Sequence, residues 1–419
     1  MGYFLFPFYC ILLSWLLTRS RFIKSARVKK WQIVALFLLK VLMGVLMGWV
    51  LKSNPNADTW GYHRDALQEY HLLFTDPANY FSNLFYTGYS YGYDGVLQFH
   101  DSYWNDLKTN LIIKFVSVLH VFSFGNYYVN VVLYNFFVFF GHIALFKFFK
   151  SVFKGNSNVS LITAFLLPSH LLFSSIIHKE GLIFTAISFV VCLFYSSIKL
   201  NRFTFKKSLV ILLSLLIIFF FRNYILVVLL PALFSWYVST KTQKSSLLIF
   251  ASVFLVCIVF FFLSSLTPVN LPHLLIQKQA DFVSLGKANS TICVPEMMPD
   301  FKSFLINAPK AFAHTLFRPW VGDYALSKLL FVFALEMLVY YAMIVLLFIY
   351  PAKRMNDTAS VNFLLFFSVP MLLLIGYIVP VLWEIIRYRA IYLPFLITPL
   401  IHRINWERFR YFNRNKKIQ

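Results

Sequence analysis

The sequence predicts an all-α protein, a polytopic transmembrane helical bundle of about eleven spans. Two features of composition predict it: 59% of the 419 residues are hydrophobic and only 13% are charged, whereas soluble proteins carry about a quarter charged residues. The third feature is a series of apolar runs long enough to cross the ~30 Å hydrocarbon layer of a bilayer. A helix satisfies its own backbone hydrogen bonds in lipid, so each run is expected to be helical. No linker separates a soluble part, and residues 1–419 are expected to form a single integral membrane domain.

The apolar runs define the expected spans in chain order. The first run has no basic region before it and no small-residue cleavage site after it, so it is expected to be a span and not a removable signal peptide. Runs of spanning length lie at 3–18, 31–51, 127–146, 160–177, 181–198, 246–265, 327–350 and 360–382. Three shorter runs, at 208–221, 225–240 and 389–403, complete the eleven. Segment 111–124 has an apolar stripe interrupted by Lys114 and His120, and it could lie in the membrane interface instead of crossing.

Basic residues gather in short segments that alternate between the expected spans. Six segments hold 23 of the 38 Lys and Arg residues: 19–30, 147–154, 199–207, 241–244, 353–354 and 403–417. Because basic residues are retained in the cytoplasm, these segments are expected inside, with the N-terminus outside and a basic cytoplasmic tail at 403–417. On this assignment 13 of the 16 acidic residues lie on the outer side. The net charge of +22 is then positive-inside charge, and nucleic acid is not an expected partner.

Two outer segments, 52–110 and 266–326, are long enough to contain short helices. The first interleaves Trp and Tyr residues with carboxylates. Its carboxylates are Asp58, Asp65, Glu69, Asp76, Asp94, Asp101 and Asp106. Aromatic rings suit stacking on sugar faces, although aromatic belts at membrane interfaces produce a similar enrichment. We therefore expect 52–110 to be the catalytic face of a membrane enzyme.

Asp58 follows the second expected span by a few residues. If a helix begins there, Asp58 or Thr59 would be its N-cap. One face of that helix would carry Asp58, Tyr62, Asp65 and Glu69, at spacings of 4, 3 and 4. Carboxylates on one face beside the membrane could provide a general base or hold a divalent ion. In the alternative, Asp58 only caps the helix and the other acids face water.

His178, Lys179 and Glu180 form a tight outer turn between two expected spans. A solvated turn needs only Gly and one polar residue, so three titratable groups exceed the requirement. They are expected to bind substrate, unless the turn is a solvated tip from which Lys179 reaches lipid phosphate. Pro168 and His170, in the preceding run, indicate a kink and a buried histidine more than a pair of ligands.

Two arginines are expected near the outer membrane surface. Arg222 ends a short apolar run that another short run follows at once. A charge at that depth needs a partner and is a functional candidate, with an interface anchor as the alternative. Arg318, in LFRPWVGD, adds an outer cation beside Pro319 and Trp320, which are typical of interface anchors.

The last outer turn, WEIIRYRAIYLPFL, presents Glu384, Arg387 and Arg389 before the final expected span. Arginine binds phosphate through two parallel hydrogen bonds. This pair is therefore expected to hold a lipid-linked phosphate, with Glu384 orienting one arginine. Ordinary contact with lipid headgroups is the alternative.

Other chemistries lack their sequence motifs. The four Cys residues show neither a disulfide framework nor a paired metal motif. The sequence also lacks a phosphate-binding glycine loop, HExxH and GxSxG.

With these residues, the chain resembles the GT-C class of integral membrane glycosyltransferases, near the bacterial relatives of protein O-mannosyltransferases and lipid A aminoarabinose transferase. The matching elements are ADTWGY with Asp58, HKEG after a Pro-containing helix, FFFRNY with Arg222, and RYR-x4-PFL with Arg387, Arg389 and Pro394. The chain departs from the class in an extra apolar segment before the first outer loop. Its acidic motif also has a single Asp, which leaves the base assignment and any requirement for a divalent metal open.

The resemblance implies transfer of a sugar, with inversion, from a polyprenyl-phosphate-linked donor to a glycan, lipid or protein acceptor. The reaction would take place at the outer face of the bacterial inner membrane, with the lipid-linked sugar as donor and a divalent metal as a possible cofactor. Asp58 would deprotonate the acceptor. Arg222, Arg387 and Arg389 would hold the donor phosphate, and Lys179 and Glu180 would border the pocket. Such a reaction needs a carboxylate toward the acceptor and cations toward the departing phosphate.

Two other functions fit the same features. A surface-polysaccharide polymerase would use the same kind of donor, and its loss would accumulate single repeat units. A lipid-linked oligosaccharide flippase or other transporter would keep ionisable groups near the middle of the membrane, often in repeated halves. Here charges within spans are few, chiefly Lys40 and Glu336, and the acids crowd one surface, which favours an enzyme.

Overall fold

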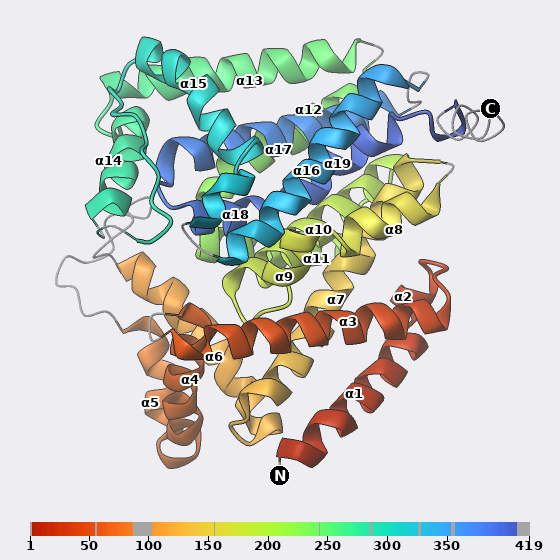
Figure 1. Cartoon of the computed structure of the whole chain (residues 1–419), viewed down its shortest axis with the longest axis vertical. Helices are drawn as coiled ribbons and strands as arrows, with labels where there is room; N and C mark the ends of the chain where they lie inside the picture. The colour runs from red at the N-terminus through yellow and green to blue at the C-terminus, as the bar shows by residue number, and fades with distance from the viewer. Residues whose placement is uncertain are drawn as a thin grey trace. The chain divides into compact units, whose positions relative to one another are not determined.

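The computed structural model describes residues 2–54, 57–86, 103–154, 156–242, 244–284, 286, 288–325, 328–352 and 357–408. Every element named in these ranges is a helix, and two isolated antiparallel bridges join Thr291 to Val381 and Pro351 to Ile404 (Figure 1). The prediction of an all-helical protein is confirmed. Asp94, Asp101, the basic segment 353–354 and residues 409–417 of the basic tail lie outside the described residues.

Seven helices in the described ranges are long and apolar enough to cross a membrane. They are α3 (Lys30–Val50), α7 (Tyr127–Val152), α10 (Lys179–Lys199), α12 (Tyr224–Lys241), α13 (Ser246–Leu263), α16 (Lys328–Ile349) and α17 (Thr358–Ile378). α13 exposes Leu255, Val259 and Phe260, as a helix facing lipid does. These helices indicate a membrane protein, as the composition predicts.

The count of eleven spans is not confirmed. The structure divides the expected span 160–177 into α8 (Ser157–Phe165) and α9 (Pro168–Phe173). Pro168 has no backbone N–H and therefore favours the start of a new helix. α1 (Gly2–Arg19) and α19 (Leu393–His402) are shorter apolar helices, and α11 (Phe205–Arg222) carries basic residues at both ends.

The first of two compact units comprises Met1–Phe148 and His170–Leu226. Besides α1, α3, most of α7, α10 and α11, it contains α2 (Arg21–Lys24), η1 (Leu51–Ser53), α4 (Asp58–Thr75), α5 (Pro77–Ser82), η2 (Asn83–Phe85) and α6 (Tyr103–Ser123). α10 packs along α11, and α4 packs along α6. A Cβ at Gly44 of α3 would lie 2.4 Å from the carbonyl oxygen of Ser175, so a larger residue at position 44 would separate these two backbones.

α6 contains the segment 111–124, whose apolar stripe is interrupted by polar residues. One of these, Lys114, forms an ion pair with Glu69 of α4 and donates to the carbonyl oxygen of Tyr80. A second, Ser117, lies 2.9 Å from the Tyr80 hydroxyl. Lys114 and Ser117 therefore meet α4 and α5, which accounts for these two polar residues without a ligand.

A second polar cluster lies on the apolar helices of this unit. Lys40 of α3 is fully buried. Its Nζ lies 2.9 Å from Ser174 Oγ, 3.0 Å from Ser175 Oγ and 3.4 Å from His142 Nε2 of α7. A charge buried among apolar helices requires such partners, and two other segments of the chain supply them.

The second compact unit comprises Phe149–Ser169 and Val227–Gln419. Besides α8, α12, α13, α16, α17 and α19, it contains η3 (Ser264–Leu266), α14 (Leu271–Ser284), α15 (Phe301–Leu316), η4 (Val321–Ala325) and α18 (Leu382–Arg389). The second expected outer segment, 266–326, thus contains short helices. α15 packs on α17, where Tyr377 donates to the carbonyl oxygen of Phe304 over 2.6 Å. A Cβ at Gly376 would lie 2.1 Å from the carbonyl oxygen of Ala311, so the two helices approach backbone to backbone there.

Replacing Gly376 by Ala is expected to lower the thermal midpoint of the detergent-solubilised protein. The added methyl group must push α15 away from α17, and such overpacking costs about 1 to 3 kcal/mol. Gly61→Ala in α4 is the matched control, since a Cβ at Gly61 meets no atom within 4 Å and Ala favours helices over Gly. Size-exclusion chromatography of heated samples measures both midpoints. Equal midpoints for the two variants would contradict the close approach.

Candidate active site

Asp58 lies on the first turn of α4, and its two neighbours fix that turn in the first unit. The Thr59 hydroxyl lies 2.8 Å from the hydroxyl of Tyr127, at the start of α7. The Trp60 indole donates to the carbonyl oxygen of Gly48 in α3 over 2.9 Å and stacks on the Tyr127 ring at 4.0 Å. The end of α3 and the start of α7 therefore hold Asp58 in place.

The expected N-cap role of Asp58 or Thr59 does not appear in the structure. The N-cap residue of α4 is Ala57, and no side chain caps the helix. The Asp58 carboxylate is instead directed to His178, whose Nε2 lies 2.9 Å from Asp58 Oδ2. Asp58 thus contacts another part of the chain and does not cap its own helix.

Four titratable side chains form one connected line, which we call the Asp58–Arg222 line: Asp58, His178, Glu180 and Arg222. His178 Nδ1 pairs with one oxygen of Glu180, and the other oxygen of Glu180 pairs with the Arg222 guanidinium. Arg222 also donates to the Tyr224 hydroxyl over 2.9 Å. The side chain of Asp58 is 44% exposed, whereas those of His178, Glu180 and Arg222 are 7%, 2% and 10% exposed. The line therefore runs from a surface carboxylate to a buried ion pair.

The HKEG turn has the local structure that this line requires. The Tyr134 hydroxyl of α7 donates to the carbonyl oxygen of His178 over 2.5 Å, which fixes the turn. Glu180 lies in the first turn of α10, where the helix dipole favours a negative charge. A Cβ at Gly181 would lie 2.1 Å from the Tyr134 hydroxyl oxygen, so this position needs Gly. His178 and Glu180 are buried, and the turn is not a solvated tip.

Lys179 is partly buried and faces a different side of the turn. Its Nζ lies 3.4 Å from the Thr109 hydroxyl and 5.2 Å from the centre of the Tyr62 ring. The Tyr62 ring in turn lies 5.6 Å from the His178 ring. An ammonium group therefore stands near the exposed end of the Asp58–Arg222 line, with one aromatic ring between them.

The two remaining acids of α4, Asp65 and Glu69, have surroundings that differ from those of Asp58. Asp65 is exposed, and partial burial raises the pKa of its carboxyl group while the nearby Arg64 lowers it. Glu69 pairs with Lys114 and accepts a hydrogen bond from Asn83 over 2.8 Å. Across the described ranges, no group of three His, Cys, Asp or Glu residues is arranged to hold a metal ion. A divalent ion at this site stays a prediction.

The four other predicted site residues belong to the second unit. Arg318 pairs with Asp323 over 3.3 Å, and Arg387 pairs with Glu384, the residue expected to orient it. Arg389 is fully buried and donates to the carbonyl oxygens of Thr315, over 2.8 Å, and Arg318. Its guanidinium group thus satisfies backbone carbonyls at the end of α15. The expected contact of Arg389 with phosphate stays a prediction.

Sequence reasoning missed the residues that hold the candidate site together. Tyr134, Thr59 and Trp60 act through contacts with residues distant in sequence, which spacing along the chain does not reveal. Comparison with known proteins finds no matching family model, no similar curated protein and no similar solved structure. The functional argument therefore rests on the geometry of the site.

Glu180→Gln is expected to destabilise the protein much more than Asp58→Asn, although both carboxylates contact His178. Removing one partner of a buried ion pair costs about 3 to 5 kcal/mol, whereas an exposed pair contributes about 0 to 1 kcal/mol. Thermal midpoints of the two purified variants give the comparison. Similar midpoints would contradict the burial of Glu180 between His178 and Arg222.

Proposed function

We propose that the protein is a GT-C-type integral membrane glycosyltransferase that transfers a sugar from a polyprenyl-phosphate-linked donor to an acceptor at the outer membrane face. The single observation that carries the proposal is the Asp58–Arg222 line. It combines an exposed carboxylate with a buried imidazole and a buried, charge-paired carboxylate. All of these groups lie where α3 and α11 end and where α4, α7 and α10 begin.

The distribution of charge along α7 supports the outer location of this site. The start of α7 contacts Thr59 through Tyr127, and near its other end Lys147 donates to the Ser25 hydroxyl over 2.8 Å. Tyr127 and Lys147 are separated by about 30 Å at 1.5 Å per residue, which matches the hydrocarbon thickness. The basic segments 19–30 and 147–154 thus lie at the opposite end from Asp58. By the positive-inside rule, we place Asp58 outside, and with it the topology of eleven crossings, an outer N-terminus and a cytoplasmic C-terminus.

The proposed reaction takes place at the exposed end of the Asp58–Arg222 line. Asp58 accepts the proton of the acceptor hydroxyl as the acceptor oxygen attacks the anomeric carbon, and the sugar–phosphate bond breaks. His178 orients the Asp58 carboxylate, and Glu180 compensates the charge on an imidazolium, as a third group orients the base in other proton-transfer sites. Arg222 keeps the buried Glu180 ionised. We propose this role for Arg222 in place of its expected contact with the donor phosphate. Lys179, next to His178 on the same turn, is the cation that we assign to the departing phosphate.

Transport is a second candidate because of one observation. Lys40 is buried on a spanning helix among His142, Ser174 and Ser175, and ionisable residues within spans often mark transport pathways. A transporter would depend on Lys40 and tolerate loss of the Asp58 carboxylate. A polysaccharide polymerase would depend on Asp58 as a transferase does, and differs in accumulating single repeat units.

Asp58→Asn is expected to reduce the glycan product at least about 100-fold, the usual contribution of a general base, without reducing the amount of protein in the membrane. The variants are expressed in a strain lacking the gene, and envelope glycans and lipid-linked sugars are measured by mass spectrometry. Asp65→Asn is the matched control, since Asp65 is exposed on the same helix and the substitution removes the same charge.

Wild-type glycan output from Asp58→Asn would reject the transferase proposal. If Lys40→Met alone abolished output while Asp58→Asn retained it, transport would replace transfer as the proposed function.

A further inference from the structure

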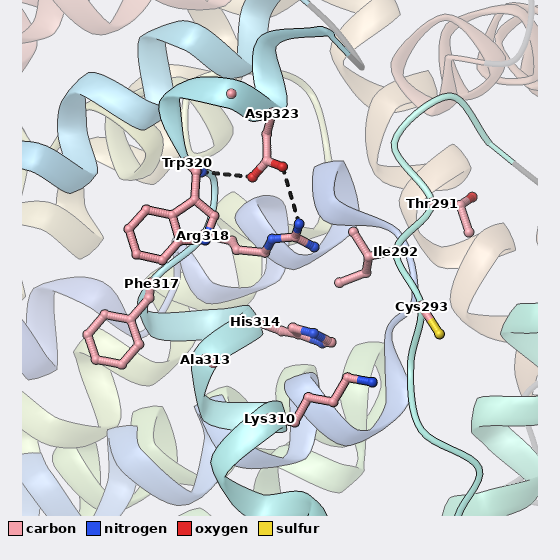
Figure 2. A pocket seen from close by; sticks show the side chains of 11 residues that line it. Thr291, Ile292, Cys293, Lys310, Ala313, His314, Phe317, Arg318, Trp320 and Asp323 are labelled. Carbon is pink, nitrogen blue, oxygen red and sulfur yellow. Dashed lines mark hydrogen bonds and ion pairs between the residues drawn. The ribbon is translucent and has the colours of Figure 1, made fainter.

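The second unit contains a cavity of about 910 Å³ that the proposed chemistry does not use. One wall is the second half of α15 and the residues that follow it, and the other is the extended segment 291–293 (Figure 2). Its volume is in the range of sites for small molecules and cofactors, about 300 to 1,000 Å³.

Both walls of the cavity are fixed by other elements of the unit. The segment 291–293 is held by backbone hydrogen bonds from Ile292 to Pro380, over 2.7 Å, and from Leu382 to Ser290, over 2.8 Å. α15 is held against α17 at Gly376, and the buried Arg389 binds carbonyl oxygens at the end of α15. The cavity therefore belongs to the packed structure of the unit.

Three nitrogen-bearing side chains project into the cavity from one side of α15 and its extension. Lys310 and His314 are four residues apart on one face of α15, and Arg318 follows two residues after the helix ends. Figure 2 shows their nitrogen atoms directed toward the segment 291–293. This face carries two permanent positive charges and an imidazole.

The one carboxylate in the lining does not neutralise this face. One oxygen of Asp323 lies 3.3 Å from the Arg318 guanidinium, and the other accepts the backbone N–H of Trp320 over 2.7 Å. Arg318 uses one of its five N–H donors in that contact. Lys310, which is exposed, forms no ion pair within the described ranges.

His314 provides the feature that points to a ligand. Its side chain is only 7% exposed, and its buried Nδ1 has no hydrogen-bond partner in the described part of the chain. Leaving a buried polar atom unpaired costs about 1 to 3 kcal/mol. Burial and the charges of Arg318 and Lys310 lower the pKa of His314 to about 4, so the imidazole is neutral at pH 7 and can donate one N–H to an oxygen atom.

The side chains on this wall of the cavity favour one class of ligand. A planar guanidinium, an ammonium group and an imidazole N–H suit a multiply charged oxyanion, and Arg and Lys are the usual protein partners of phosphate. Phe317 and Trp320 also border the cavity, and Figure 2 shows their exposed rings directed away from the segment 291–293. Rings of this kind are typical of a membrane interface.

We propose that Lys310, His314 and Arg318 form a phosphate-binding site, which takes the phosphate of a lipid headgroup or free phosphate. The site lies in the second unit, is built from residues outside the Asp58–Arg222 line, and does not depend on the proposed transferase activity.

The test measures binding to the purified full-length protein in a non-ionic detergent, by isothermal titration calorimetry. The probes are short-chain phosphatidic acid, inorganic phosphate, and a fatty acid of matched length as the carboxylate control. Lys310→Gln and His314→Gln are each expected to weaken phosphatidic acid binding at least about tenfold while the thermal midpoint stays within a few degrees. Lys302→Gln, an exposed lysine on the first turn of α15 that does not line the cavity, is expected to bind as the wild type does.

Binding of phosphatidic acid but not inorganic phosphate identifies a lipid headgroup as the source of the ligand, and similar binding of both identifies free phosphate as sufficient. The proposal is overturned if neither probe binds, if Lys310→Gln and His314→Gln bind as the wild type does, or if the fatty acid binds as tightly with the same dependence on Lys310. None of these measurements involves sugar transfer, so their failure is distinct from failure of the proposed function.

Discussion

A carboxylate buried at the end of an apolar helix bundle is the constraint on which the candidate active site depends. Glu180 can remain ionised there only because an imidazole and a guanidinium lie against it, since an isolated charge in such surroundings is far too costly. The two partners come from the turn before α10 and from the end of α11. Meeting this requirement therefore joins the start of α10 to the end of α11, and His178 then reaches Asp58 on a third segment, α4.

Much of the fold could be predicted from the sequence, because each spanning helix corresponds to a continuous apolar run. The misses have local causes as well: Pro168 divides an expected span, and the basic residues at both ends of α11 shorten its apolar part. Sequence reasoning also singled out Asp58, His178, Glu180 and Arg222 separately. The pairing of the 178–180 turn with Asp58 and with Arg222 could not be predicted, because it depends on contacts between residues 120 and 42 positions apart.

The arginines show where sequence reasoning reaches its limit. Both Arg318 and Arg389 were expected at the outer face near aromatic residues, Arg389 as a ligand of the donor phosphate and Arg318 as a further outer cation. In the structure Arg389 is enclosed by backbone carbonyls, whereas Arg318 faces a cavity. The difference depends on which carbonyl groups lie nearby, and no pattern in the sequence records it. Lys310 and His314 are four residues apart in the sequence, but a spacing of this kind on an amphipathic helix is common on solvated faces.

The burial of Lys40 also has a consequence for the insertion of this protein into the membrane during its synthesis. A lysine at the centre of a lone helix raises the cost of insertion into lipid by about 2.5 to 3.5 kcal/mol. The groups that receive its ammonium, on His142, Ser174 and Ser175, are 102, 134 and 135 positions downstream. A ribosome must therefore synthesise more than a hundred further residues before Lys40 acquires these partners. Until then the nascent chain either keeps this helix at the translocon or carries an unsatisfied cation in the bilayer.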